Sequence, residues 1–324
     1  PVETSRSTVH NTWFDADYDF NQNHSISFRY TYANRNPRVK NDFMVEKTYT
    51  NENKENTLRR ELTTVQDPNK EHIATLYYRG RTKEWKLYGD FNYNYYTSDN
   101  DYRFEEEGGQ HLYTALHNQK HYTRLALDAT RTIKEKTTVN AGYINVFRQY
   151  KSQNDIANSS SYEYRNQIYA SVSRTFNSQL NGNLHGNAEL LRSEYSDNHE
   201  NQWLWSLGGN LRYRFNKSNY FINCGYNIRT TYPNQGQLNP IGYQSGYDVW
   251  IVGNPNLKAN LLHMVKFDVY LGKFSILGGI NYSGNHISNL ITQDETTGIV
   301  QSYHNLKYFN PYGGVKFLHN KTLF

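Results

Sequence analysis

The feature that most constrains this chain is a two-residue alternation of apolar and polar side chains that recurs in long runs. In residues 202–215 the apolar set is Trp203, Trp205, Leu207, Gly209, Leu211, Tyr213 and Phe215. Polar residues such as Asn210, Arg212 and Arg214 fall between them, and Leu204 is the one apolar exception. Because successive side chains of a β-strand point to opposite faces, this run predicts a strand with one apolar and one polar face.

Further runs of the same kind occupy residues 25–32, 85–95, 180–190, 219–229, 265–271 and 274–282. Strands of globular proteins peak near 5–6 residues, whereas a tilted strand that crosses a membrane needs about 9–11. Most of these runs have the length that a membrane-crossing strand needs. A soluble β-rich protein, which is the alternative, has no need of aromatic residues at both ends of each apolar stripe. The runs therefore favour membrane-spanning strands.

The connections between the runs alternate in length. Short turns are expected at residues 21–24, 82–84, 133–136, 176–179, 216–218 and 272–273, and long polar loops near 35–70, 98–119, 150–161, 195–201, 231–260 and 285–299. Outer-membrane barrels combine short periplasmic turns with longer extracellular loops. We predict an all-β fold: an antiparallel transmembrane β-barrel, with about 14 strands in this chain, integral to a bacterial outer membrane.

The composition agrees with this fold. Tyr, Phe and Trp make up 15% of the chain, with 30 Tyr, and Tyr and Trp concentrate at membrane–water interfaces. A Tyr-rich soluble β protein is the competing explanation, because Tyr also favours strands. The mean hydropathy of −0.90 is compatible with barrel strands, which are apolar on one face only. A net charge of +5 without any Lys/Arg run gives no reason to expect a nucleic-acid partner.

We expect residues 1–324 to form a single, partial barrel domain with no plug domain and no signal peptide. Residues 1–4 carry neither a basic region nor an apolar run, and a strand is predicted almost at once, near Val9. At the other end, Phe324 is out of phase with Val315 and Phe317, and His319 and Lys321 occupy positions that should face lipid. These features favour part of a larger barrel.

A proline-containing stretch carries a family resemblance. It reads Thr231-Tyr232-Pro233, then Leu238-Asn239-Pro240, then Gly253-Asn254-Pro255-Asn256-Leu257-Lys258. This pattern resembles the TonB-dependent receptor-like outer-membrane β-barrel family of Bacteroidota, in which Pro-Glu usually follows the final Lys. Here Ala259-Asn260 stands in that place. The matching residues cover about 30 positions, and the rhythm of strands and turns covers the rest.

The resemblance implies a barrel of about 22 strands, a plug supplied by a segment absent from this sequence, and import powered by the TonB complex. By the same resemblance, the imported nutrient would be a glycan, a peptide or a metal chelate. Further partners would be outer-membrane lipid, a surface lipoprotein and the barrel-assembly machinery. Two alternatives remain at this stage. One is a passive porin-like channel, and the other is a non-transport scaffold or a client of the assembly or secretion machinery.

The same stretch supplies the candidate ligand contacts, because aromatic and amide groups in an extracellular loop suit sugars or peptides: Tyr232, Asn239, Tyr243, Tyr247 and Trp250. The competing explanation is loop architecture. Pro233, Pro240 and Pro255 cannot donate to a strand ladder, so they end strand pairing and stiffen the loop.

The polar phase of the strands places Arg29, Arg212, Arg214 and Arg229 toward the lumen. They either influence passage through the pore or form ion pairs along the barrel wall. His117 and His121 suit a metal ion only on a helix, and His199-Glu200 lacks any supporting catalytic motif. We therefore expect no metal site, no cofactor and no enzymatic activity.

Overall fold

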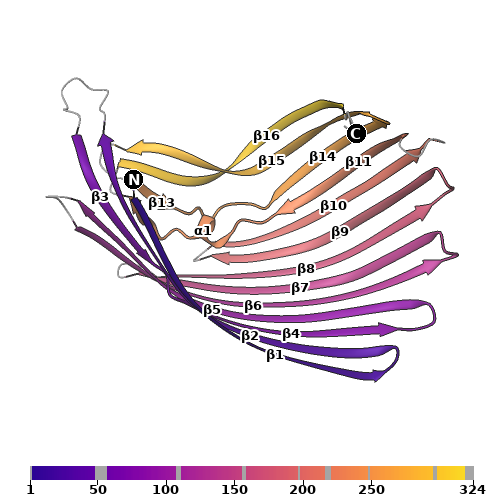
Figure 1. Cartoon of the computed structure of the whole chain (residues 1–324), viewed down its shortest axis with the longest axis horizontal. Helices are drawn as coiled ribbons and strands as arrows, with labels where there is room; N and C mark the ends of the chain where they lie inside the picture. The colour runs from indigo at the N-terminus through magenta and orange to yellow at the C-terminus, as the bar shows by residue number, and fades with distance from the viewer. Residues whose placement is uncertain are drawn as a thin grey trace, which may run out of the picture.

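The computed structural model describes residues 2–47, 57–106, 111–154, 158–195, 198–215, 220–246, 249–294 and 298–317. In these ranges the chain forms one curved sheet of sixteen strands (Figure 1). The strands are β1 (Val2–Asn21), β2 (His24–Lys47), β3 (Thr57–Gln66), β4 (Asn69–Arg81), β5 (Trp85–Glu106), β6 (His111–Ile133), β7 (Thr137–Gln153), β8 (Asn158–Thr175), β9 (Leu180–Tyr195), β10 (Asn198–Arg214), β11 (Tyr220–Thr231), β12 (Tyr243–Gly246), β13 (Val249–Val252), β14 (Asn260–Leu271), β15 (Phe274–Asp294) and β16 (Gly298–Phe317).

The sheet is an antiparallel meander in which most strands pair with their neighbours in sequence. β3 and β4 both lie between β2 and β5, and Asp67 and Pro68 separate them. Together they form one crossing, by which we mean one passage of the chain from one end of the sheet to the other. The ladder is interrupted at Pro68, because proline has no N–H to donate. β12 and β13 are short strands within the β11–β14 connection. Thirteen long crossings remain among the described residues, close to the predicted number, and the predicted all-β antiparallel fold is confirmed.

The two faces of the sheet differ in chemistry along its whole width. We call the face that carries Trp205, Leu207 and Leu211 the outward face; these side chains are 47 to 62% exposed. The inner face carries Asn210 and Arg212. Cross-strand register keeps the faces separate: Trp205 lies opposite Ala188, which lies opposite Ile168. The apolar residues of a dozen strands thus form one continuous outward surface instead of a buried core.

The apolar surface has the height of a membrane. Trp203 and Trp205 border it at one end of β10, and Tyr213 and Phe215 border it at the other. From Trp203 to Phe215 the strand advances roughly 40 Å at about 3.3 Å per residue. A strand tilt of about 45° reduces this to roughly 28 Å, close to the ~25 Å apolar band of outer-membrane barrels.

The short turns lie where the alternation predicts them. Leu271 pairs with Phe274 across Gly272-Lys273, and Gly272 has a φ of +70°, as the first central residue of a type II′ hairpin requires. Turns at residues 22–23, 82–84 and 134–136 also agree with the prediction. The turn expected at 216–218 lies outside the described residues.

The predicted long loops are mostly wrong. β5 and β6 extend into residues 98–119, and β15 and β16 extend into 285–299. Because of such extensions the strands reach up to 24 residues in length, as in β2. The hydrophobic alternation ends at the edge of the apolar belt, but the backbone ladder continues because it requires no apolar side chains. In the part of the chain that the structure describes, only the 231–260 connection leaves the meander over most of its length.

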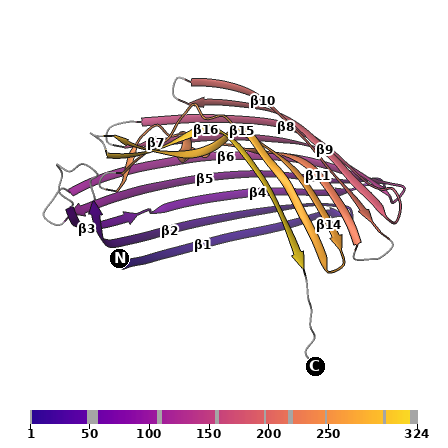
Figure 2. The ribbon, with the colours of Figure 1, turned by 90° about the horizontal axis from the view of Figure 1, so that it is seen from above.

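The two edges of the sheet are β1 and β16. In the described ranges β1 pairs only with β2, and β16 pairs with β15 and, over four residues, with β13. Figure 2 shows the curvature of the strands from above. No helix in the described ranges is long and apolar enough to cross a membrane.

A charge placed in the middle of the apolar belt tests this assignment of faces. We expect Leu207→Lys to destabilise the folded protein by about 2–4 kcal/mol, the cost of a lysine on the lipid side of a barrel. Asn210→Lys, on the inner face of the same strand, should cost less than about 1 kcal/mol. Denaturant titration in lipid vesicles measures both. Equal losses of stability would contradict the two-faced sheet.

Candidate functional site

The connection between β11 and β14 folds back onto the inner face of the sheet. We call residues 232–259 the inner segment; it contains β12, β13 and the short helix α1 (Gln235–Leu238). Figure 1 shows it running back across the half of the sheet that lies opposite the short turns. We call this half the long-hairpin half. The three prolines explain why it leaves the meander, as predicted. The inner segment is therefore a structured element in the lumen and not an exposed loop.

The two halves of the proline motif contact each other. The Gly253 N–H donates to the Asn239 carbonyl at 2.9 Å, and the Asn254 N–H donates to the Gln237 carbonyl at 2.6 Å. A Cβ at position 253 would lie 2.3 Å from the Asn239 carbonyl oxygen. Glycine is therefore required at 253 because the two halves approach so closely.

Tyr232 anchors the start of the inner segment to the wall. Its hydroxyl donates to both carboxylate oxygens of Glu189, at 2.7 and 2.6 Å. The Arg165 guanidinium lies 4.2 Å from the centre of the Tyr232 ring. Burial, followed by the hydrogen bond to Glu189, raises the pKa of Tyr232. The hydroxyl therefore stays protonated, as a donor to a carboxylate must.

Asn239 anchors the middle of the segment. Its amide donates to the Ser152 hydroxyl at 3.2 Å, and its oxygen accepts from Tyr195 at 3.3 Å and from the Ile241 N–H at 3.1 Å. Ser152 in turn donates to Asn118 at 2.9 Å. These side chains are all buried. Removing one partner would leave buried polar groups without hydrogen bonds, which is costly.

Packing and further contacts hold the end of the segment. Ala259 joins Leu191 and Leu204 of the wall in a buried apolar cluster. The cavity left between segment and wall is only about 30 Å³, about the volume of one water molecule. On the other side, β13 runs parallel to the long-hairpin end of β16, and the Asn254 amide donates to the Tyr303 carbonyl at 2.9 Å. The segment thus spans from the β7–β10 wall to the last strand.

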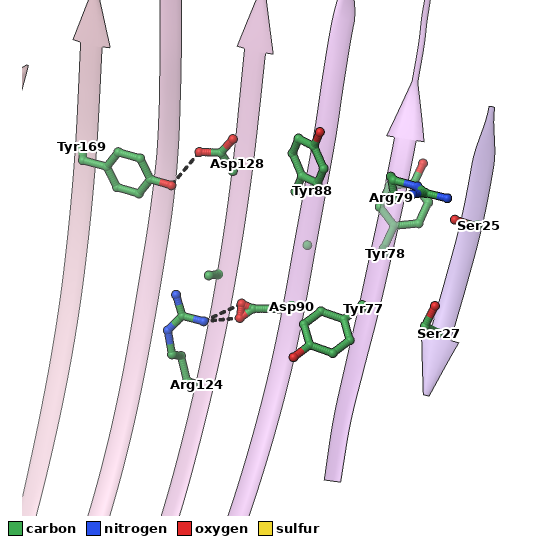
Figure 3. Close-up of a pocket in the computed structure, with 12 residues that line it drawn as sticks. Ser25, Ser27, Tyr77, Tyr78, Arg79, Tyr88, Asp90, Arg124, Asp128 and Tyr169 are labelled. Atoms are coloured by element: carbon green, nitrogen blue, oxygen red, sulfur yellow. Dashed lines mark hydrogen bonds and ion pairs between the residues drawn. The ribbon is translucent and has the colours of Figure 1, made fainter. Parts of the chain in front are cut away.

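A second inner-face feature lies nearer the short turns. A cavity of about 540 Å³ opens between β2 and β8 (Figure 3). Arg124 pairs with Asp90, and the Tyr169 hydroxyl donates to Asp128 at 2.7 Å. Tyr77 also lines the cavity. This wall offers charged groups, hydroxyls and aromatic rings to a polar solute or to another polypeptide.

The structure places the predicted ligand-contact residues in different environments. The polar groups of Tyr232 and Asn239 bond within the protein, as described above. Trp250 lies on β13 opposite Gln244 and is partly buried. The backbone of Tyr243 begins β12, its side chain is outside the described part, and Tyr247 lies outside the described residues. The architectural explanation for this stretch thus accounts for Tyr232 and Asn239.

The four predicted lumen arginines all fall on the inner face by register. Arg29 forms an ion pair with Asp15 at 2.7 Å. Arg212 stacks over Phe221 at 4.0 Å, and Arg214 and Arg229 are exposed. Pairing along the wall therefore holds for Arg29, whereas Arg214 and Arg229 present their charge to the lumen. Their effect on passage stays a prediction.

The histidine candidates do not converge. His117 and His121 lie on strand β6, where four residues separate their positions by roughly 13 Å. His117 pairs with Asp99 at 2.5 Å, and His121 contacts the Tyr93 hydroxyl at 3.1 Å. As consecutive residues of strand β10, His199 and Glu200 point to opposite faces of the sheet.

A comparison with family models decides the family. The model of the outer membrane protein beta-barrel family matches residues 78–322. The chain belongs to that family. The chain is integral to the outer membrane, and its apolar outward face therefore contacts lipid. Among curated protein sequences none matches the chain.

Solved structures share the fold at low identity. The copper transporter OprC matches with a TM-score of 0.64 and 12% identity, over 97% of this chain and 58% of that one. The ferripyoverdine receptor of the Pseudomonas aeruginosa outer membrane gives 0.57 and 8%, over 98% and 54%. The siderophore receptor PirA from Pseudomonas aeruginosa gives 0.52 and 13%, over 95% and 58%. The chain spans somewhat more than half the length of these structures.

Several residues of the site were missed by sequence reasoning. Glu189 was recognised only as a polar residue in an alternating run, and Arg165, Ser152 and Asp90 were not singled out. Their partners are 34 to 87 positions away. No local pattern reports such contacts, and only the phase of the strand indicated that Glu189 points inward.

Removing the Tyr232 hydroxyl should loosen the inner segment. A hydrogen bond to a charged group contributes about 1.5–3 kcal/mol, so Tyr232→Phe should raise amide hydrogen exchange in residues 232–259 by roughly tenfold or more. Tyr143→Phe is the matched control, because its hydroxyl bonds Asn166 at 2.8 Å on the outward face. Unchanged exchange in the Tyr232 variant would show that the anchor does not hold the segment.

Proposed function

We propose that this chain forms part of the wall of a TonB-dependent importer that carries a nutrient across the outer membrane. The observation that carries the proposal is the geometry of the lumen side. A polar inner wall is partly covered by a fixed inner segment, and the curved sheet has two edges that this chain does not join. The receptor-like fold of the solved structures supports the same function.

The unjoined edges indicate a wide barrel. Within a membrane the backbone groups of β1 and β16 need partners, since lipid supplies none. Strands in addition to the thirteen long crossings described here would complete the circumference. A barrel that wide encloses a lumen too large to be sealed by its own wall, and a plug then separates import from leakage.

The partners follow from this arrangement. A plug would occupy the lumen beside the polar cavity of Figure 3, and the TonB complex would act on it from the periplasm. The barrel-assembly machinery would insert the sheet, and a surface lipoprotein would cap the long hairpins. Arg214 and Arg229 would favour an anionic nutrient or an acidic plug surface. The nutrient class stays open among glycans, peptides and metal chelates.

Ion conductance separates active import from the passive channel. The complete protein, purified and inserted into a planar bilayer in potassium chloride, should show little steady conductance, because the plug fills the lumen. Denaturing the plug with mild urea should open steps of large conductance. Steady ohmic conductance before urea would overturn the importer in favour of a porin-like channel. A closed bilayer before and after urea would contradict both transport functions.

A further inference from the structure

An apolar groove crosses the outward face of the sheet, and β15 and β16 lie between it and the nearer edge. Its volume is about 820 Å³, and it spans β8, β9, β10, β11 and β14. Side chains from neighbouring strands form its sides: Val172, Leu184, Leu211, Tyr226, Val265 and Phe267.

Glycines make the groove. Gly209 lies opposite Leu184, and Gly182 lies opposite Leu211. A Cβ at Gly209 would lie 2.9 Å from the Asn183 carbonyl oxygen, and a Cβ at Gly182 would lie 3.1 Å from a Leu211 methyl group. The strand backbone itself therefore forms the floor, with leucine side chains on both sides. Such a channel suits a flexible hydrocarbon chain.

A cation stands at one end of the groove. Arg174 is exposed on the outward face and lies over the Phe176 ring at 5.4 Å. Its cross-strand partners, Thr137 and Gly182, carry no charge. Arg131 is a nearby outward arginine, but it pairs with Glu84 at 2.6 Å. Among the described residues no ion pair holds Arg174, so it offers a charge at the border of the hydrocarbon, where an arginine prefers a phosphate.

The register sets the direction of the groove relative to the membrane. Arg174 is two residues from Phe176 at the β8–β9 turn, whereas Phe267 is four residues from Leu271 at the β14–β15 turn. Both lie in one cross-strand row, through Gly182, Leu211 and Cys224. Since the short turns lie at the periplasmic surface, the groove deepens into the membrane from Arg174 toward β14.

We propose that this groove binds one phospholipid of the periplasmic leaflet, with its phosphate on Arg174 and an acyl chain along the glycine floor. Five strands spaced about 4.8 Å apart make the groove roughly 19 Å long. One leaflet is about 15 Å deep, half of a ~30 Å hydrocarbon core, so an oblique chain fits. The periplasmic position of Arg174 excludes a lipid whose headgroup lies at the outer surface.

Native mass spectrometry of the complete protein, extracted from outer membranes in a mild detergent, tests the headgroup contact. We expect one retained phospholipid, with retention falling roughly tenfold, or about 1.4 kcal/mol, in Arg174→Ala. Arg174→Lys keeps the charge and should retain most of it. Arg131→Ala is the matched control and should behave as the unchanged protein. No retained lipid, or equal retention in Arg174→Ala and Arg131→Ala, overturns the proposal.

Cys224 allows an independent test of the chain position. It is exposed, lines the groove and is the one cysteine of the sequence. A fluorophore is attached at Cys224 through a flexible linker, both in the protein with Arg174 and in the Arg174→Ala variant. Acyl-brominated phosphatidylglycerol should quench the first protein at a several-fold lower mole fraction of brominated lipid than the second. Cys224→Ser, treated with the same reagent, controls for labelling elsewhere. Identical quenching curves in the two proteins would show ordinary surrounding lipid only and would contradict a specific site.

Discussion

Backbone hydrogen bonding is the constraint on which the rest of this structure depends. In hydrocarbon every N–H and C=O must find a partner in the protein, and a meander of long strands satisfies this need along its whole length. The ladder continues past the apolar belt, so the hairpins extend beyond the membrane as strands. It also obliges the edges β1 and β16 to be paired within a membrane. The unbroken ladder explains the long strands, and the alternation of side chains along them gives the sheet its two faces.

The side-chain pattern predicted the features that are set by residues close together in the sequence, namely strands, their faces and short turns. The alternation in 202–215 identified β10, its two faces and the positions of Arg212 and Arg214, and Gly272-Lys273 identified a hairpin turn. It failed for residues 98–119 and 285–299, because strand pairing there is set by the register of the hairpin and not by hydrophobic phase. The contacts of Asn239 with Ser152 and of Tyr232 with Glu189 join distant strands, and only the fold brings them together.

The inner segment connects the fold to the proposed import. Its prolines prevent it from joining the meander, and its polar anchors hold it on the lumen side. In the proposed importer the inner segment lies in the half of the wall that carries the long hairpins, whereas the polar cavity between β2 and β8 lies nearer the short turns. A nutrient and a plug would then meet different parts of one wall. The proposed lipid groove lies on the opposite face of the sheet from the inner segment, because successive side chains of a strand point to opposite faces.

Accessibility along a single strand tests the two-faced barrel most directly. Single cysteines at positions 210 to 214 of β10, beyond the part that the inner segment covers, can carry nitroxide labels in lipid vesicles in a Cys224→Ser background. The account predicts that oxygen collisions peak at the odd positions and collisions with a water-soluble nickel complex peak at the even positions, with a period of two. Coincident peaks for both reagents, or no period of two, would contradict the assignment of lipid and lumen faces.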